Sequence, residues 1–299
     1  MNNISTIFSI KDLENLSGIK AHTIRIWEKR YNILEPLRTD SNIRYYDTKN
    51  LQKLLNVTVL YNNGLKISKI AKLEEDELEV KVREYASKAA NVENSLSPLK
   101  LAMLNFDLEL FEQTYNRLIA ENTFRTVFIE VFIPFLHNIG LDWQSNSITP
   151  AHEHFISNLI NQKLLINIER VQQEPVKHRE KIFVLFLPMN EIHSLGLLYL
   201  HYELLLKGYH SIYLGESVPI DNLKTFSGKY PNVTFVSYFT VKPDPDYVMD
   251  YLVEFKKEIE LDDTCDFWVL GRRTKGLELP EDFKNMRIFE NIKHLLEKI

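Results

Sequence analysis

The C-terminal part of the chain alternates short apolar runs with amphipathic stretches. The run 182–188 is too short for a typical helix and is rich in branched and aromatic side chains, which is typical of a buried parallel strand. Leucines then recur at helical spacing from Leu195 until Gly208, where a glycine ends the predicted helix. Further strands are predicted at 210–214, 233–239 and 267–271. This alternation predicts a doubly wound parallel sheet.

The middle of the chain has a helical period instead. From 99 to about 173, apolar residues keep the three- and four-residue spacing of one helix face after another. The first face comprises Leu101, Leu104, Leu108, Phe111, Tyr115 and Leu118. The stretches 127–139 and 155–168 repeat the pattern. Four such segments joined by short polar turns predict a four-helix bundle.

At the N-terminal end, two short helices are predicted on either side of a glycine turn. Ser9 is a suitable N-cap for the first helix, and Gly18 interrupts it. The second helix, 20–31, turns Ile24 and Trp27 inward and its cations outward. This arrangement is typical of a helix-turn-helix whose second helix enters a major groove.

The next segment is predicted to form a β-wing. Residues 34–50 contain extended sequence on both sides of a polar turn at 40–42, so their cations can reach phosphates beside the groove. Helices predicted at 48–62 and 67–73 complete the small domain.

An acidic run at 74–79 leads through helical sequence to a break at 95–98, which we interpret as a linker. The chain is therefore predicted to be multidomain. Its parts are an all-α winged helix-turn-helix domain (1–75), a linker (76–98), a central four-helix bundle (99–175) and a C-terminal α/β Rossmann-like, flavodoxin-like parallel sheet (176–299).

The distribution of charge adds a functional expectation. The 299 residues are 44% hydrophobic and 26% charged, as in ordinary globular proteins, and carry a net charge of −5. Residues 1–73 hold eight Lys and four Arg against three Asp and three Glu, a net charge of +6, which leaves −11 for the rest. A basic module on an acidic body predicts contact with a polyanion through that module.

The sequence also restricts the compartment. No apolar run approaches the length that spans a bilayer, and the first residues lack the basic and apolar parts of a secretory signal. We therefore expect a cytoplasmic protein with no membrane partner. The single cysteine, Cys265, excludes an internal disulfide and a paired-cysteine metal motif, and it is expected to pack inertly beside a strand.

The candidate chemistry lies where the first buried strand ends. His193 follows that strand, at the edge where open α/β sheets place their ligands. An exposed imidazole is a good metal ligand, and Glu191 is placed to orient its second nitrogen. The Glu-x-His-x-x-Gly pattern is short, and a lone loop histidine can also be solvated or cap a helix. The strands that follow favour the ligand interpretation, because they supply a sheet with switch-point loops.

With its later residues, this domain resembles the cobalamin-binding Rossmann module. Glu191, His193 and Gly196 match the first element of its signature. Ser237 lies 41 residues beyond Gly196, at the place of the signature serine, and Gly271 matches a later glycine. The resemblance implies that His193 is the lower axial ligand of cobalt. It also implies that the serine and the glycines make room for the nucleotide tail of the cofactor.

The N-terminal helices and wing resemble the DNA-binding domain of the MerR family over about residues 7–75. The matching motifs are Thr23-x-Arg25-x-Trp27-Glu28-x-Arg30-Tyr31 and Arg44-Tyr45-Tyr46. Mapped onto this chain, the resemblance implies contacts with double-stranded DNA by Thr23, Arg25, Arg30, Arg38, Arg44 and Tyr45. Trp27 is expected in the core, and Glu28 is expected to brace an arginine.

A third motif lies in the predicted bundle. Trp143 is followed ten residues later by Glu153 and His154. This spacing resembles the Trp-x9-Glu-His motif of the CarH/LitR-like MerR regulators, whose bundle covers the upper face of adenosylcobalamin. The resemblance implies that Trp143 shields the upper axial group while Glu153 and His154 line the same cavity. Packing and helix capping are the alternative roles for these three residues.

Three positions depart from these patterns. Phe239 stands where leucine is usual, and Arg272 replaces a second glycine. Gln144 occupies the place of a histidine that captures cobalt in light-responsive members. These departures motivate a second hypothesis, in which the regulator keeps the fold, has lost the cofactor and responds to a protein or another small ligand.

The sequence thus predicts a DNA-binding transcription regulator and not an enzyme, since nothing in it resembles a Walker loop, a nucleophile elbow or a zinc helix. We expect a repressor controlled by adenosylcobalamin that binds between the bundle and the Rossmann domain. It should bind a palindromic operator as a homo-oligomer, either a dimer or a tetramer. A third hypothesis is a corrinoid methyl-carrier protein, which would need a methyltransferase and would not bind DNA.

Overall fold

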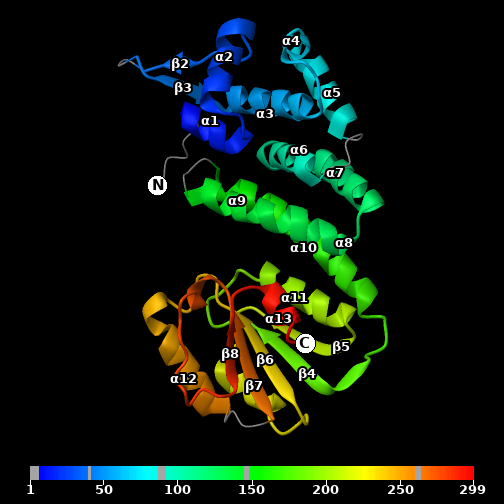
Figure 1. Ribbon diagram of the computed structural model, residues 1–299, viewed down its shortest axis with the longest axis vertical. Coiled ribbons are helices and arrows are strands. Elements are labelled where there is room, and N and C mark those ends of the chain that lie inside the picture. The colour runs from blue at the N-terminus through cyan, green and yellow to red at the C-terminus, as the bar shows by residue number, and fades with distance from the viewer. Residues whose placement is uncertain (1–6, 40–41, 87–91, 145–147, 260–263) are drawn as a thin grey trace. The chain divides into compact units, whose positions relative to one another are not determined.

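The computed structural model describes residues 7–39, 42–86, 92–144, 148–259 and 264–299. These divide into two compact units, Met1–Ile160 and Asn161–Ile299 (Figure 1). The first unit holds the N-terminal helices and most of the bundle, and the second holds the parallel sheet. Among the described residues, no helix combines the length and the apolarity needed to cross a membrane.

The N-terminal unit begins with the predicted helix-turn-helix, formed by α1 (Ile10–Ser17) and α2 (Ala21–Tyr31). Ser9 caps α1 as expected. Its hydroxyl accepts from the amide of Asp12, and the Asp12 carboxylate accepts from the amide of Ser9. Gly18 follows in the left-handed conformation, with a φ of 74°. A residue with a side chain would be strained in this conformation. The glycine therefore both ends α1 and makes the turn into α2.

The predicted wing is also present, as the antiparallel pair β2 (Leu37–Arg38) and β3 (Arg44–Asp47). A short strand that the sequence does not predict, β1 (Ile7–Phe8), pairs with the other edge of β3. The N-terminal domain (1–75), called the head below, is therefore not purely helical. Of the predicted polar turn, residues 40 and 41 lie outside the described residues. The predicted helices follow as α3 (Thr48–Asn62) and α4 (Ile67–Ile70).

Five helical segments come next, and the last four correspond to the predicted bundle. They are α5 (Glu75–Ala86), α6 (Val92–Asn105), α7 (Leu108–Glu121), a continuous run of α8 (Phe124–Val127), the π-helical turn η1 (Phe128–Phe132) and α9 (Ile133–Gln144), and α10 (Pro150–Val171). Their shared core contains stacked aromatic rings from α7 and η1, among them Phe111 and Phe132.

The break predicted at 95–98 is wrong. Pro98 lies inside α6, and it is buried together with Leu99 and Lys100. A proline inside a helix removes one backbone hydrogen bond, but packing of the surrounding face stabilises the helix through it. Both α5 and α6 contact α3, so this segment packs against the N-terminal domain.

The C-terminal unit is the predicted doubly wound sheet. Its elements are β4 (His178–Phe186), α11 (Leu195–Leu206), β5 (Tyr209–Gly215), the 3-10 turn η2 (Ile220–Phe226), β6 (Val233–Tyr238), the 3-10 turn η3 (Pro245–Tyr247), α12 (Val248–Ile259), β7 (Cys265–Leu270), the 3-10 turn η4 (Arg272–Thr274), β8 (Met286–Phe289) and α13 (Ile292–Leu296). All five strands run parallel in the order β5-β4-β6-β7-β8. The flavodoxin-like prediction is therefore confirmed, with β8 and α13 added to it.

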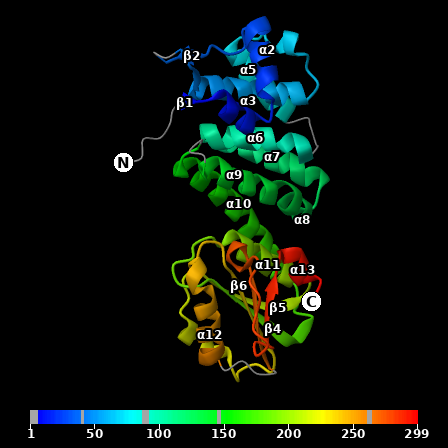
Figure 2. The same ribbon diagram turned by 60° about the vertical axis from the view of Figure 1, so that its left-hand side comes forward.

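Helices cover both faces of this sheet (Figures 1 and 2). One face packs against α12 and η2, through residues such as Phe255 and Leu223. The other face packs against α11 and α13, through residues such as Leu200 and Leu295. Because both faces are buried, the carboxyl edge of the strands is the place where the sheet can present side chains to a ligand.

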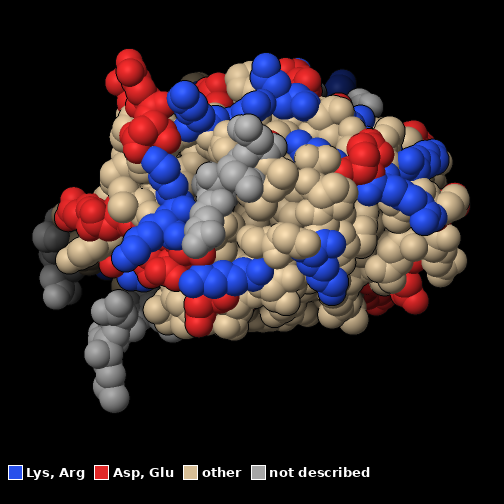
Figure 3. Space-filling model, turned by 90° about the horizontal axis from the view of Figure 1, so that it is seen from below, with Lys and Arg blue, Asp and Glu red and all other residues tan. Residues whose placement is uncertain are grey.

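Figure 3 shows the molecule from below. On this face, Lys and Arg side chains are interspersed with Asp and Glu, and large uncharged areas separate them. No continuous basic surface is formed by the described residues seen there.

Candidate functional site

The loop after β4 is built around a buried carboxylate. Glu191 is 0% exposed, and both of its oxygens accept hydrogen bonds. Oε1 accepts from the amides of Ile192 (3.0 Å) and His193 (2.9 Å) and from Nδ1 of the His193 ring (2.6 Å). Oε2 accepts from the amides of Val241 (2.6 Å) and Lys242 (2.7 Å), which belong to the loop after β6. One carboxylate thus joins two loops at the carboxyl edge of the sheet and fixes the imidazole.

These bonds determine the state of both side chains. Burial alone would raise the pKa of Glu191, but the hydrogen bonds from the His193 ring and from three backbone amides outweigh it and lower the pKa to about 2. The carboxylate is therefore ionised and can only accept, so Nδ1 of His193 must carry a proton. In a neutral imidazole of this tautomer, the lone pair lies on Nε2, as metal ligation requires.

Exposed apolar side chains lie on the two loops that Glu191 joins. Met189 and Ile192 lie on the loop of His193 and are 50% and 63% exposed, and Val241, on the second loop, is 40% exposed. The His193 side chain itself is 51% exposed. Exposed apolar side chains on the loops that carry an oriented imidazole suit a partly apolar ligand.

The other predicted residues of the cobalamin signature gather at the same edge. Ser237 is the fifth residue of β6, and its buried hydroxyl donates to the carbonyl of Phe186 at 2.9 Å. Gly196 lies in the first turn of α11, where an added Cβ would come within 3.0 Å of the Tyr238 ring. Tyr238, which sequence reasoning missed, therefore packs closely over Gly196.

Gly271 has a backbone role that the structure makes explicit. Its φ is 116°, and an added Cβ would meet the carbonyl oxygen of Phe239 at 2.5 Å. Only glycine adopts this conformation without strain. The close approach of the chain after β7 to the end of β6 therefore depends on Gly271.

Two of the departures from the signature are placed by the structure. Phe239 is fully buried in the core, edge-on to Tyr251 with 5.4 Å between ring centroids. Arg272 is exposed at the start of η4. Its neighbour Arg273 donates from Nε to the carbonyl of Val241 at 2.9 Å, which further fixes the loop that holds Glu191.

The third motif lies in the N-terminal unit. Trp143 and Gln144 end α9, and their side chains are outside the described part of the structure. Glu153 and His154 are in the first turn of α10, with Oε2 of Glu153 3.2 Å from Nδ1 of His154, and the His154 side chain is largely exposed. Beside them, the ring of His152 stacks on Phe106, an exposed aromatic residue with positive φ, at 4.8 Å.

The predicted recognition helix has the expected two faces. Ile24 and Trp27 of α2 are buried, and the Trp27 ring packs edge-on against Tyr61 at 4.9 Å. Arg25 and Arg30 are exposed, and Thr23 is half-buried. The core role expected for Trp27 is therefore observed, and the predicted DNA contacts on this helix are accessible.

The wing carries an unfavourable arrangement of charge. In the pairing of β2 with β3, Arg38 lies directly opposite Arg44. Like charges opposite one another on neighbouring strands are destabilising unless an anion offsets them. Glu28 of α2 lies 3.7 Å from Nε of Arg44, as the bracing role predicts, and it also accepts from the hydroxyl of the buried Tyr46 at 2.9 Å. Arg38 donates from Nη1 to Oδ1 of Asn42 at 2.7 Å.

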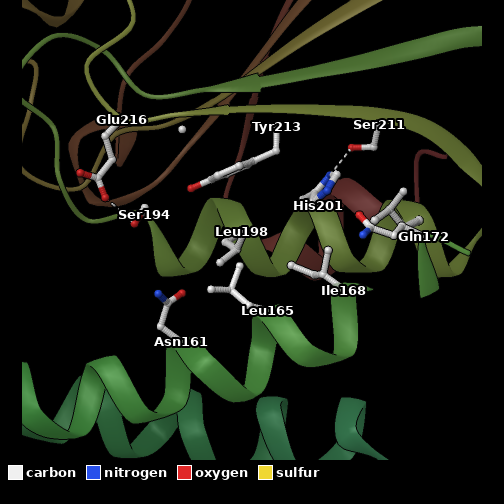
Figure 4. A pocket seen from close by; sticks show the side chains of 12 residues that line it. Asn161, Leu165, Ile168, Gln172, Ser194, Leu198, His201, Ser211, Tyr213 and Glu216 are labelled. Carbon is white, nitrogen blue, oxygen red and sulfur yellow. Dashed lines mark hydrogen bonds between the residues drawn. The ribbon is translucent and has the colours of Figure 1, made fainter. Parts of the chain in front are cut away.

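A cleft of about 630 Å³ lies elsewhere in the C-terminal unit, between the second half of α10, α11 and the edge strand β5 (Figure 4). At one end, the Ser194 hydroxyl donates to Glu216 at 2.7 Å, and at the other, Nδ1 of His201 bonds the Ser211 hydroxyl at 2.8 Å. Burial lowers the pKa of His201 to about 4, so this imidazole is neutral at physiological pH. His193 does not line the cleft.

The structure thus gathers Glu191, His193, Gly196, Ser237 and Gly271 at one edge of the C-terminal unit. Sequence reasoning missed the amides of Val241 and Lys242, which hold the second oxygen of Glu191. The available signal was their position directly after a predicted strand, at the edge where parallel strands end.

Comparison with known proteins defines the class. Residues 8–77 match the family described as MerR HTH family regulatory protein, and residues 96–166 match the B12 binding domain family. The chain therefore carries a MerR-type helix-turn-helix domain, followed by a helical segment that matches the B12 binding domain. The predicted family resemblance is confirmed.

The chain is also similar to individual proteins. The chain is 27% identical over 223 residues to the HTH-type transcriptional repressor CarH of Myxococcus xanthus, a match that covers 72% of this chain and 73% of the relative. It is 25% identical over 221 residues to the repressor CarA of the same organism, covering 70% and 68%. Among solved structures, the Methanosarcina barkeri monomethylamine corrinoid protein matches with a TM-score of 0.58 at 15% identity, over 70% of this chain and 100% of the other. At that identity the last match shows a shared fold alone.

Proposed function

We propose that this protein is a transcriptional repressor whose affinity for a palindromic operator is controlled by adenosylcobalamin, with His193 as the axial ligand of cobalt. The observation that carries the proposal is the hydrogen bond of 2.6 Å from Nδ1 of His193 to the buried Glu191, because it orients the imidazole and fixes a proton on Nδ1 at the carboxyl edge of the sheet.

The residues at this edge fit a corrinoid better than a bare metal ion. A bare ion needs several protein ligands, and across the described ranges no group of three or more His, Cys, Asp or Glu side chains is arranged to hold one. Cobalt in a corrin ring already has four equatorial nitrogens, so one protein ligand suffices. The exposed apolar side chains of Met189, Ile192 and Val241 suit the face of such a macrocycle.

Each residue has a defined share in this proposal. Glu191 holds the tautomer and orientation of His193, and the amides of Val241 and Lys242 hold Glu191. Three residues of the helical segment would line the cofactor cavity, as the resemblance of their motif implies: Trp143, Glu153 and His154. When bound, the corrinoid would supply a cobalt centre, which His193 would hold. If one conformation of the protein binds the corrinoid more tightly than another, the corrinoid shifts the population towards that conformation. The affinity for the operator would then depend on whether the corrinoid is bound.

The cobalt ligand is tested by retention of the cofactor. Protein incubated with adenosylcobalamin and then desalted should keep the visible spectrum of a corrinoid. His193→Ala is expected to reduce retention at least about ten-fold, because the oriented ligand is lost. His294→Ala, which removes an exposed histidine on α13, is the matched control and should behave as wild type. Equal retention by His193→Ala would exclude the axial role, and a colourless wild type would favour the cofactor-free regulator.

DNA binding is tested separately. Arg25→Ala and Arg44→Ala are each expected to weaken binding to the DNA upstream of the protein's own gene by about ten-fold in a fluorescence titration. Arg44→Ala should also reduce the slope of log affinity against log salt by about one, since a phosphate contact is lost. Arg179→Ala, on an exposed position of β4, is the control. Absence of any complex with wild-type protein at low salt would favour a corrinoid carrier.

Control of DNA binding by the corrinoid is measured in the same titration with and without adenosylcobalamin. Tighter binding of the loaded protein would support repression in the loaded state. Identical affinities would leave a regulator whose head and B12-binding domain act independently, contrary to the proposal.

A further inference from the structure

A lysine of the B12-binding domain reaches into the DNA-binding head. Lys100 lies on α6, within residues 96–166, which match the B12 binding domain. The residue is only 9% exposed, and its Nζ donates to the carbonyl of Leu16 at 3.1 Å. Both views of the fold show α6 beside α1 and α3 (Figures 1 and 2). This contact joins two segments that are 84 residues apart in the sequence.

The acceptor is at a place where a cation stabilises a helix. Leu16 is in the last turn of α1 (Ile10–Ser17), and the last four carbonyls of a helix have no partner within it. The aligned peptide dipoles give this end a partial negative charge. α1 has no basic residue in its own last turn, so the ammonium group comes from α6.

This carbonyl is next to the turn that directs the recognition helix. Leu16 precedes Gly18 by two residues, and α2 begins three residues after the left-handed Gly18, at Ala21. A second hydrogen bond, from Nε2 of Gln52 on α3 to Oδ1 of Asn105 at the end of α6, holds the same two parts together at 2.5 Å. The orientation of α2 on the head is therefore linked to the position of α6.

We propose that Lys100 is a positioning residue for DNA recognition: from the B12-binding domain, it fixes the C-terminal end of α1 and with it the turn that presents α2. This role rests on the DNA-binding half of the proposed function. Lys100 is only 9% exposed, and its ammonium group donates to Leu16, so it is not presented to a phosphate. Its removal should misplace the recognition helix without removing a DNA contact.

The test is operator affinity as a function of salt, for the full-length protein. Lys100→Met keeps the length and the apolar stem of the side chain but removes the donor and the charge. It is expected to weaken operator binding about ten-fold, with the slope of log affinity against log salt unchanged, because that slope counts phosphate contacts. Lys100→Arg keeps a donor and should retain most of the affinity. Lys163→Met, which removes the other lysine of the matched segment from α10, should bind as wild type.

Two results would overturn the role. Wild-type affinity in a folded Lys100→Met protein would show that the contact does not position α2. A slope reduced by about one, as expected for Arg44→Ala, would show that Lys100 contacts DNA directly. If Lys100→Met does not melt cooperatively, Lys100→Gln, which keeps a polar head in the same space, must show the same loss of affinity at unchanged slope. A wild-type protein that binds no DNA would instead contradict the proposed function.

Discussion

Replacing Glu191 by alanine is expected to lower the free energy of unfolding of the C-terminal unit by about 3 to 5 kcal/mol. The substitution leaves the backbone donors of Ile192, His193, Val241 and Lys242 without their acceptor in a site that excludes water. It also frees the ring of His193, so corrinoid retention should be lost with it. Urea denaturation followed by circular dichroism measures the first effect, and the desalting assay measures the second.

The isosteric variant sharpens this prediction. Glu191→Gln keeps the shape, but its amide group offers one oxygen and one NH2 where the native site presents donors to both oxygens. Whichever way the amide turns, its NH2 group faces backbone N–H donors. A substantial part of the loss in the free energy of unfolding should therefore remain. Glu216→Gln, on an exposed carboxylate of the same unit, is the control and should change the free energy of unfolding by less than about 0.5 kcal/mol. A loss below about 1 kcal/mol in Glu191→Ala would contradict the description of Glu191 as the buried centre of the two loops.

The contribution of Glu191 should also depend on pH in a defined direction. Hydrogen bonds hold its pKa at about 2 in the folded protein, below the ordinary value of 4.5. A depressed pKa means that the folded state favours the ionised carboxylate, so the stabilisation is fully present above about pH 4.5 and is lost as the pH falls towards 2. The difference in the free energy of unfolding between wild type and Glu191→Gln should therefore stay constant above about pH 4.5 and become smaller as the pH falls from there to about 2.

The sequence predicts the fold where a pattern is long or locally complete. The apolar run 182–188 and the leucine-rich helix after it predict β4 and α11, and β4 differs at both ends, beginning at His178 and ending at Phe186. β8 escapes prediction because its four residues, Met286–Phe289, include an arginine and are too few to show a period. Pro98 misleads for a different reason, since local propensity predicts a break while burial against the rest of the bundle stabilises the helix.

The same distinction applies to the candidate site. Glu191 and His193 are recognisable because an acceptor and a ligand two residues apart lie in one loop after a strand. The amides of Val241 and Lys242 are not recognisable, because backbone donors leave no side-chain signal and lie 50 and 51 residues from their acceptor. Lys100 is hidden similarly. Its role depends on a carbonyl of a different domain, and no local pattern marks a lysine that caps another helix.

Gly271→Ala is expected to destabilise the C-terminal unit by about 3 kcal/mol or more, and to abolish corrinoid retention with it. An added Cβ would lie 2.5 Å from the carbonyl oxygen of Phe239 and 2.8 Å from its backbone nitrogen and carbonyl carbon. These are backbone atoms at the end of a central strand, where Phe239 also accepts from the amide of Arg273, so they cannot move aside cheaply. The φ of 116° adds strain that any side chain would have to bear.

The chain offers a matched control for this substitution. Gly276 lies in the same connection and also has a positive φ, of 78°, but nothing within 4 Å of its ideal Cβ position. Gly276→Ala should therefore cost only the conformational strain, about 1 kcal/mol. The difference between the two variants in urea denaturation measures the contact with Phe239 together with the greater strain at Gly271, whose φ and ψ are 116° and 176°. Equal losses would contradict the prediction, because neither the contact nor the extra strain would then affect stability. A large excess in Gly271→Ala would show that the edge of the sheet on which Glu191 and His193 depend requires glycine at this position.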